Sequence, residues 1–368
     1  MSDEKTMAME DDDRQLGVAA ALKCGLELVM DGKFKESLIL FNEAIRLDAA
    51  CGEAYNCKAL ALMESKHYDE AFGCFEKAIA TDPGNGKYWY NKSLLFRSLN
   101  MYEDEAQACL QSLNLDQGNM QAWYGCARAL ARTGEQKEAI SCMEKALALE
   151  PNNADMWYSL GSYQAWAGMT ESSLKSFNSA IDICPEHAGA WFAKGESLAL
   201  LGNYAGAADS IDRAIQINPG IAEAWYSKGM LYVREGKYDD ALMALDRAIE
   251  NRPDYTDAWF YRGCVMEIQG RMPEALESYD RTTSIEPRSH VAWFMKGVLL
   301  GRIENYGLAI ECFDKAIEIS PQYAEAWYHK GVYSGIVGDN EEAARCMSKA
   351  IEIDPNFNPG SHPGIDSQ

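Results

Sequence analysis

Four cationic side chains in the first half of the chain have types and a spacing that could bind a carboxylate: Lys87, Arg97, Arg128 and Arg132. Arginine presents a planar guanidinium that can hydrogen-bond both oxygens of a carboxylate, so an acidic side chain or a chain terminus is a suitable ligand. The whole chain has a formal net charge of -22, so a local excess of cations is unexpected. Whether these side chains converge depends on the elements that hold them.

Residues that could perform catalysis are not grouped in this way. The patterns G-x-S-x-G, H-E-x-x-H, G-x-x-x-x-G-K-[ST] and G-x-G-x-x-G are absent from the sequence. The five histidines are dispersed, and four of the eleven cysteines recur at one repeating position where serine or alanine otherwise stands, which is typical of small packing residues. We therefore expect no enzymatic activity, no cofactor and no metal.

Composition limits the partners and the compartment. The net charge opposes binding to nucleic acid, and no apolar run is long enough to span a membrane. The acidic start MSDEKTMAMEDDDRQ has no apolar core of a secretion signal, and the odd number of cysteines without a C-x-x-C pair fits free thiols. These features predict a cytoplasmic protein.

The elements themselves are predicted by an internal repeat. Eight of the nine tryptophans follow one another at intervals of 34 residues, and eight of the eleven prolines keep the same step. If the residue three before each tryptophan is position 1, ten repeats start at Val18, Gly52, Gly86, Met120, Ala154, Ala188, Ala222, Thr256, His290 and Ala324. They run from 18 to 357. An acidic disordered tail is expected over 1–17 and a Pro/Gly-rich tail over 358–368.

Each repeat reads as two helices. Positions 4, 8 and 11, for example Trp225, Gly229 and Tyr232, lie on one face of a first helix. Glycine is common at position 15, where a turn is expected, and small residues at positions 20 and 27 mark a second helix that ends before the proline at position 32. Position 8 is Gly, Ala or Ser in every repeat, which predicts a close approach of two helices.

This pattern resembles the tetratricopeptide repeat (TPR), and the resemblance covers about nine-tenths of the chain. It implies an all-α solenoid, a right-handed superhelix of about ten helix-turn-helix repeats whose first helices line a concave groove. The carboxylate clamp of some TPR proteins is not matched, because position 5 is never Lys and position 9 is never Asn. Two departures from the family pattern are a basic column at position 7 and Glu105 in place of the small residue at position 20.

Groove-facing positions of the third and fourth repeats contain the four cations and Asn91, and they contain no acid. One interpretation is a site for an acidic side chain or a terminal carboxylate. The other is that the arginines pair with acids of the chain such as Glu64 and Asp155.

Trp166 is the single tryptophan outside the repeating column, at position 13 of the fifth repeat. We expect it to contact a partner, since tryptophan is enriched at binding hot spots. The alternative is local packing with Leu200. In the eighth and ninth repeats, Phe260, Tyr261, Phe294 and Met295 could accept apolar anchors of an extended or helical segment.

The basic column at position 7 lies on the flank of the buried stripe, so its side chains are expected to cover apolar surface with their charged heads in water rather than to bind a ligand. At the C-terminal end the sequence after Ile353 cannot form a capping helix, which would leave Met347 and Ile351 exposed. We therefore expect end-to-end self-association or coverage by a partner.

The function expected from these features is a non-catalytic scaffold or adaptor that binds a peptide segment or a protein surface, possessing an acidic portion, in its groove. Two alternatives stay open. One is an architectural subunit that assembles a larger complex through its uncapped end or convex face. The other is a regulatory subunit of a separate enzyme.

Overall fold

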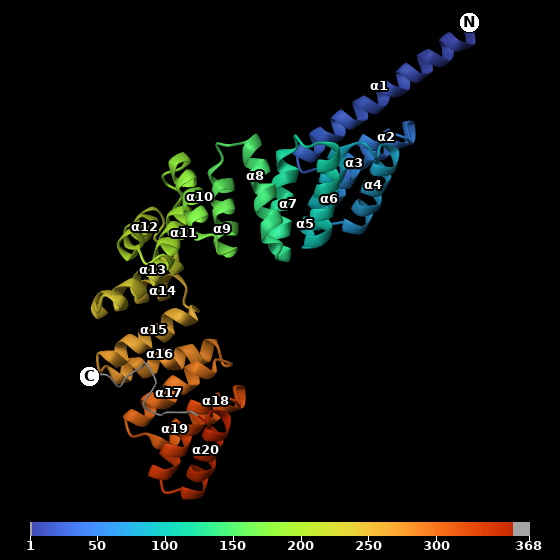
Figure 1. The fold of residues 1–368 in the computed structure, drawn as a ribbon. Helices are drawn as coiled ribbons and strands as arrows, with labels where there is room; N and C mark the ends of the chain where they lie inside the picture. Colours follow the sequence, from blue (N-terminus) through green and yellow to red (C-terminus); the bar gives the residue numbers. More distant parts are fainter. Residues whose placement is uncertain (1, 356–368) are drawn as a thin grey trace. The chain divides into compact units, whose positions relative to one another are not determined.

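The computed structural model describes residues 2–355, with side chains from Asp13 onwards. Within this range the chain forms twenty α-helices and no strand, which confirms the all-α solenoid class (Figure 1). The chain divides into two compact units, Met1–Ala190 and Trp191–Gln368. The boundary falls inside one helix, three residues after its start.

The first unit contains the helices α1 (Ser2–Met30), α2 (Phe34–Leu47), α3 (Gly52–Glu64), α4 (Tyr68–Thr81), α5 (Gly86–Ser98), α6 (Tyr102–Leu115), α7 (Met120–Thr133), α8 (Gln136–Leu149), α9 (Ala154–Trp166) and α10 (Thr170–Ile183). Consecutive helices pack on one another along this unit.

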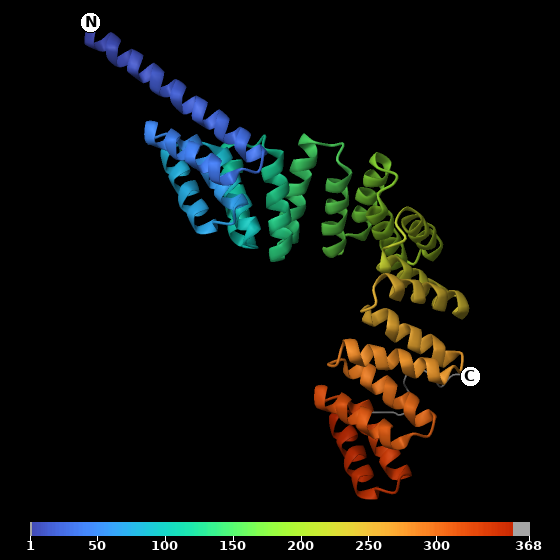
Figure 2. The same cartoon turned by 180° about the vertical axis from the view of Figure 1, so that it is seen from behind.

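The second unit contains most of α11 (Ala188–Leu200), followed by α12 (Tyr204–Ile217), α13 (Ala222–Arg234), α14 (Tyr238–Asn251), α15 (Thr256–Ile268), α16 (Met272–Ile285), α17 (His290–Arg302), α18 (Tyr306–Ile319), α19 (Ala324–Ile336) and α20 (Asn340–Ile353). From the opposite side the same succession of helix pairs is seen (Figure 2). Over the two units together, nine of the ten predicted repeat starts coincide with the first residue of a helix. The exception is Val18, which lies inside α1.

The N-terminal end differs from the expectation of a disordered tail over 1–17. The helix α1 already begins at Ser2 and continues without interruption to Met30. Residues 2–16 contain neither glycine nor proline and include the good helix formers Ala, Met, Glu and Gln, so they can extend the anchored first helix of the repeat. The tail over 358–368 lies outside the described residues.

Small residues at position 8 have a steric cause. A Cβ atom added to Gly161 would lie 2.5 Å from the ring of Phe177, and one added to Gly263 would lie 2.7 Å from the ring of Tyr279. Both rings occupy position 24 of the same repeat, in its second helix, and are buried. The first helix therefore approaches a large core side chain closely, which confirms the predicted crossing. Between the two helices, Gly134 at position 15 has a φ of 91°, which favours glycine.

Two contacts repeat between neighbouring repeats. The indole Nε1 of the position-4 tryptophan donates a hydrogen bond to the backbone carbonyl six residues earlier, as from Trp225 to Pro219 at 2.8 Å. The same bond forms at Trp123, Trp157, Trp259, Trp293 and Trp327. The tryptophan thus links its helix to the end of the preceding repeat.

The second contact involves the basic column at position 7. Lys228 pairs with Asp212 at 2.6 Å, and the same spacing of sixteen residues joins Lys92 to Glu76, Arg262 to Asp246, Lys296 to Asp280 and Lys330 to Asp314. The column is therefore structural, but its charged heads lie on acids of the preceding second helix and near the position-4 tryptophan rings rather than free in water.

Candidate partner-binding groove

Two of the predicted site residues are engaged within the protein. The Asn91 side chain in α5 is buried and donates a hydrogen bond to the Asn56 side chain of α3 at 2.9 Å. Lys87, also in α5, pairs with Glu53 at 3.0 Å, although both side chains reach solvent. Asn91 is thus part of the packing between repeats, and Lys87 forms an ion pair between repeats at the surface.

Arg128 in α7 pairs with Glu105 in α6. The carboxyl group of Glu105 is deeply buried, and this burial raises its pKa, while the Arg128 and Arg97 charges act in the opposite direction. An intramolecular acid was one of the two interpretations of the arginines, but the partner is neither Glu64 nor Asp155. Glu105 therefore occupies a position where other repeats have a small residue, and its buried charge is compensated by the Arg128 guanidinium.

Arg97 and Arg132 make no ion pair with any residue among 13–355, and both are exposed. Burial raises the pKa of Tyr163 in α9 to about 12, and Arg128 and Arg132 are the cations that act against this increase. Burial also raises the pKa of Tyr90 in α5, where Arg97 and Arg128 oppose the rise. The helices α5 and α7 contact each other, and Arg128 lies near both tyrosines, so we call Arg97, Arg128 and Arg132 together the basic surface.

Trp166 is the last residue of α9, and its side chain is 73% exposed. Leu200, the alternative packing partner, belongs to the second unit and is itself exposed. A large aromatic side chain without internal packing is therefore presented at the C-terminal end of a first helix in the same compact unit as the basic surface.

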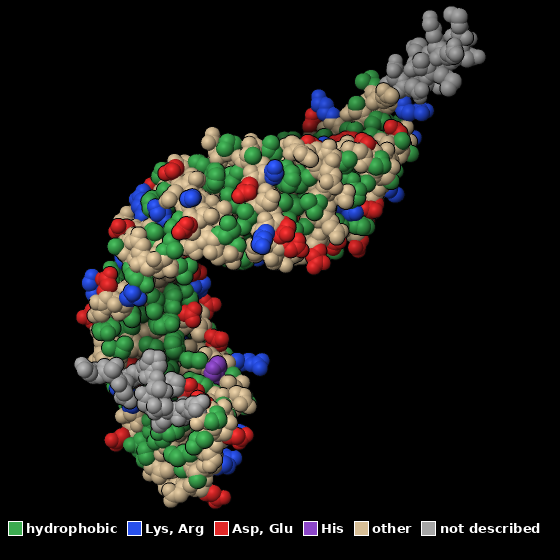
Figure 3. All heavy atoms as spheres, in the orientation of Figure 1, with side chains coloured by type: hydrophobic (Ala, Val, Ile, Leu, Met, Phe, Trp, Pro, Cys, Tyr) green, Lys and Arg blue, Asp and Glu red, His purple; other side chains and the backbone are tan. Residues whose placement is uncertain are grey.

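The apolar candidates of the second unit are half-buried. Phe260 and Tyr261 in α15 have ring centroids 5.4 Å apart, and Phe294 in α17 lies 5.1 Å from the Tyr323 ring and 5.8 Å from the Phe313 ring. Phe294 is thus as much a core residue as a surface residue. Hydrophobic side chains gather on the face of helices α13–α16, with carboxylates beside them (Figure 3).

Three further charged side chains of the second unit, Arg234, Glu267 and Arg302, are engaged within the protein. Arg302 donates to Glu267 Oε1 at 2.6 Å, and the Tyr279 hydroxyl donates to Glu267 Oε2 at 2.9 Å. The Arg234 guanidinium lies 3.7 Å from the centre of the Tyr204 ring. These side chains are engaged by other residues of the protein, so they offer little to a ligand.

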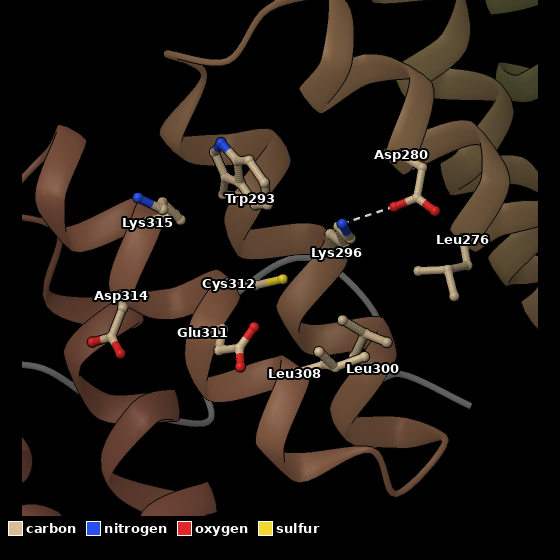
Figure 4. Close-up of a pocket in the computed structure, with 10 residues that line it drawn as sticks. All are labelled: Leu276, Asp280, Trp293, Lys296, Leu300, Leu308, Glu311, Cys312, Asp314 and Lys315. Carbon is tan, nitrogen blue, oxygen red and sulfur yellow. Dashed lines mark ion pairs between the residues drawn. The ribbon is translucent and has the colours of Figure 1, made fainter.

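A cavity of about 590 Å³ lies between α16, α17 and α18 (Figure 4). Trp293 and Leu276 line it, together with Lys296, which pairs with Asp280 at 2.8 Å. A second cavity, of about 470 Å³, is lined by the equivalent Trp157. Because both cavities are lined by the tryptophan that joins neighbouring repeats, we interpret them as gaps between stacked helices rather than as ligand sites.

The position-25 acids that hold the basic column were not recognised in the sequence. Their signal is present, since an acid stands sixteen residues before five of the position-7 cations. Among residues 13–355 no cluster of three or more His, Cys, Asp or Glu side chains has metal-site geometry. Nor does any helix in the described part of the chain have the length and apolar character needed to cross a membrane.

At the C-terminal end Met347 and Ile351 of α20 are exposed, by 37% and 59%. The contacts that join neighbouring repeats could not all form between this end and the first repeat of a second copy, however. The first repeat has Ala21 at position 4 and Cys24 at position 7, and the last repeat has Ser348 at position 25. A second copy docked end to end would therefore lack both the tryptophan bond and the ion pair.

Three family models described as tetratricopeptide repeat match residues 52–85 and 120–153, residues 167–220 and 226–289, and residues 290–323 and 324–357. Together the matched segments cover more than half of the chain. No curated protein matches significantly.

Among solved structures, the C-terminal part of a TPR repeat-containing protein from Cytophaga hutchinsonii is 15% identical with a TM-score of 0.53, over 63% of this chain and 95% of that chain. YrrB, described as "a TPR protein with an unusual peptide-binding site", is 25% identical with a TM-score of 0.45, over 51% of this chain and 97% of that chain. The Cut9-Hcn1 heterotetramer of APC/C is 14% identical with a TM-score of 0.47, over 92% of this chain and 74% of that chain. The first of these similarities supports the solenoid fold.

Proposed function

Because the chain belongs to the tetratricopeptide repeat family, we propose that it is a non-catalytic scaffold or adaptor in the cytoplasm that binds a peptide segment or protein surface along its first helices. Members of this family commonly act in protein interactions, and the stacked helix pairs present long surfaces on which a partner can lie. The ligand carries an acidic portion.

The observation that carries this proposal is the pair of exposed arginines without ion-pair partners, Arg97 and Arg132, on either side of Arg128. Arg128 and Arg302 are held by internal carboxylates, whereas Arg97 and Arg132 are not. Arg281 and Arg288 also lack an ion pair among residues 13–355, but they lie in the second helix α16 and in the turn after it, not on a first helix. Arg97 and Arg132 are therefore suited to a carboxylate supplied by a partner. Trp166 adds an exposed aromatic side chain that can cover the ligand.

The test is a selection of random dodecapeptides displayed on phage, followed by affinity measurement for the enriched peptides. We expect enrichment of Asp and Glu. The variant Arg97→Glu/Arg132→Glu should lose at least tenfold in affinity, because each reversed charge repels the ligand. The matched control is Lys137→Glu/Lys145→Glu, which makes the same change in net charge on exposed residues of α8. Full affinity in the arginine variant would refute the site.

A second candidate is an architectural subunit that uses the exposed Met347 and Ile351 of α20. Its distinguishing variant is Met347→Asp, which leaves the arginines unchanged. Loss of a partner complex in Met347→Asp, with full retention in Arg97→Glu/Arg132→Glu, would favour this candidate over the groove.

A further inference from the structure

A cluster of tyrosines in the second unit is suited to a cation, whereas the basic surface of the first unit is suited to an anion. The Tyr226 ring of α13 lies 5.2 Å from the Tyr255 ring and 5.8 Å from the Tyr261 ring of α15. All three side chains are half-buried, so part of each ring is open to solvent. Aromatic rings carry negative charge on their faces and attract cations placed over them.

Two carboxylates border these rings, Glu196 on α11 and Asp257 on α15. Burial raises the pKa of the Tyr226 phenol above its usual value, and Tyr261, Asp257, Tyr255 and Glu196 add to the effect. Asp257 also stands four residues before Tyr261 on α15, so these two side chains share one face of that helix. Both acids are exposed, and neither makes an ion pair with any residue among 13–355.

The Glu196 carboxylate is partly desolvated although it reaches solvent. This desolvation raises its pKa, and the Ser227 hydroxyl of α13 acts in the opposite direction. An apolar side chain placed over the tyrosines would remove more water from Glu196 and Asp257 without compensating their charge, which is unfavourable. A cationic side chain would compensate both. The charges thus select a basic occupant over the apolar anchor that Tyr261 alone suggests.

The chain's own Arg252 illustrates the same chemistry at the edge of this cluster. Its guanidinium lies 3.7 Å from the centre of the Tyr255 ring and donates to Glu223 at 2.9 Å. Arg252 therefore already contacts the Tyr255 ring and compensates the charge of Glu223. Tyr226 and Tyr261, with Glu196 and Asp257, have the same combination of groups, and no cation among residues 13–355 pairs with these two acids.

From this arrangement we infer that Tyr226, Tyr261, Glu196 and Asp257 form a site for a lysine or arginine side chain of the bound segment. This inference rests on the proposed function, and it adds that the second unit takes a basic residue of the partner. The site selects among partners by charge, since a segment with an acid in this place would meet two carboxylates.

The test uses dodecapeptides selected as above against the wild-type protein. We expect Lys or Arg at one position of the enriched peptides, and replacement of that residue by norleucine, which keeps the apolar stem and removes the charge, should weaken binding about tenfold. In Glu196→Lys/Asp257→Lys the basic peptide should bind no better than its norleucine form.

The matched control is Asp209→Lys/Glu277→Lys, which changes two exposed acids on the second helices α12 and α16 of the same two repeats. It should retain the full tenfold preference. The inference is overturned if the selected peptides carry no basic residue, if norleucine binds as well, or if the preference survives in Glu196→Lys/Asp257→Lys. Failure to select any peptide would instead refute the groove function on which the inference rests.

Discussion

The Arg128 guanidinium of α7 pairs with a Glu105 carboxylate of α6 that is 1% exposed, at a position where every other repeat has alanine or serine. A buried carboxylate without a counter-charge is strongly unfavourable. Arg128 therefore stabilises the fold in addition to any contact with a ligand. Mutations that remove it will change both the stability of the protein and its affinity for the ligand.

Replacement Arg128→Ala should lower the free energy of unfolding by about 3 kcal/mol near pH 8, because it leaves the buried Glu105 carboxylate unpaired. The double variant Glu105→Ala/Arg128→Ala should lose much less, since alanine is the residue that other repeats have at this position. Denaturant unfolding followed by circular dichroism measures both. Equal losses in the two variants would show that the ion pair is not what Arg128 contributes.

The loss in Arg128→Ala should also depend on pH. Burial already raises the pKa of Glu105, and removal of Arg128 takes away charge interactions that lower it. A carboxyl group with a raised pKa in the folded state binds protons more readily there than in the unfolded chain, so stability increases as the pH falls. The loss relative to wild type should therefore be smaller at pH 5 than at pH 8, and a loss independent of pH would contradict the assignment.

Trp166→Ala should weaken the binding of acidic peptides about tenfold and leave the midpoint of thermal unfolding unchanged, because the side chain makes little internal contact. Met243→Ala is the control, since this side chain is also exposed but belongs to the second helix α14. A drop in thermal stability without a change in affinity would identify Trp166 as a packing residue instead.

Asn42→Asp should stabilise the protein by about 0.5 kcal/mol at low salt. Asn42 occupies position 25 of the first repeat, sixteen residues before Lys58, which makes no ion pair in the described part of the chain. The aspartate would supply the acid that Lys228 and Lys296 find at the same spacing. The gain should disappear in 1 M salt and in Lys58→Ala, and a gain that persists there would have another origin.

Gly263→Ala should destabilise the second unit by about 1–3 kcal/mol, because the new Cβ atom would lie 2.7 Å from the Tyr279 ring. Gly335→Ala in α19 is the control. Its Cβ atom would meet nothing closer than 3.6 Å, and alanine favours helix, so no loss is expected. Thermal unfolding of the two variants compares them, and equal stability would remove the packing argument for position 8.

The repeat architecture was predictable because its signals are local and periodic: Trp225 and Gly229 define one face of a helix by their spacing alone. The partner of Arg128 was not predictable in this way. Glu105 precedes it by 23 residues and lies on a second helix, so the pairing depends on how two helices pack. The tyrosine cluster was missed for the same reason, since Tyr255 lies in a turn outside the groove-facing columns and only packing brings it to Tyr226.

The central claim is that the first helices of the third and fourth repeats bind the ligand. Photo-crosslinking tests it most directly, with a photoreactive amino acid placed either at Gln121, an exposed groove position of α7, or at Lys145, an exposed position of α8. With an acidic dodecapeptide from the selection, we predict crosslinks from position 121 that are lost in Arg97→Glu/Arg132→Glu. Crosslinks from position 145 and none from position 121 would contradict the account.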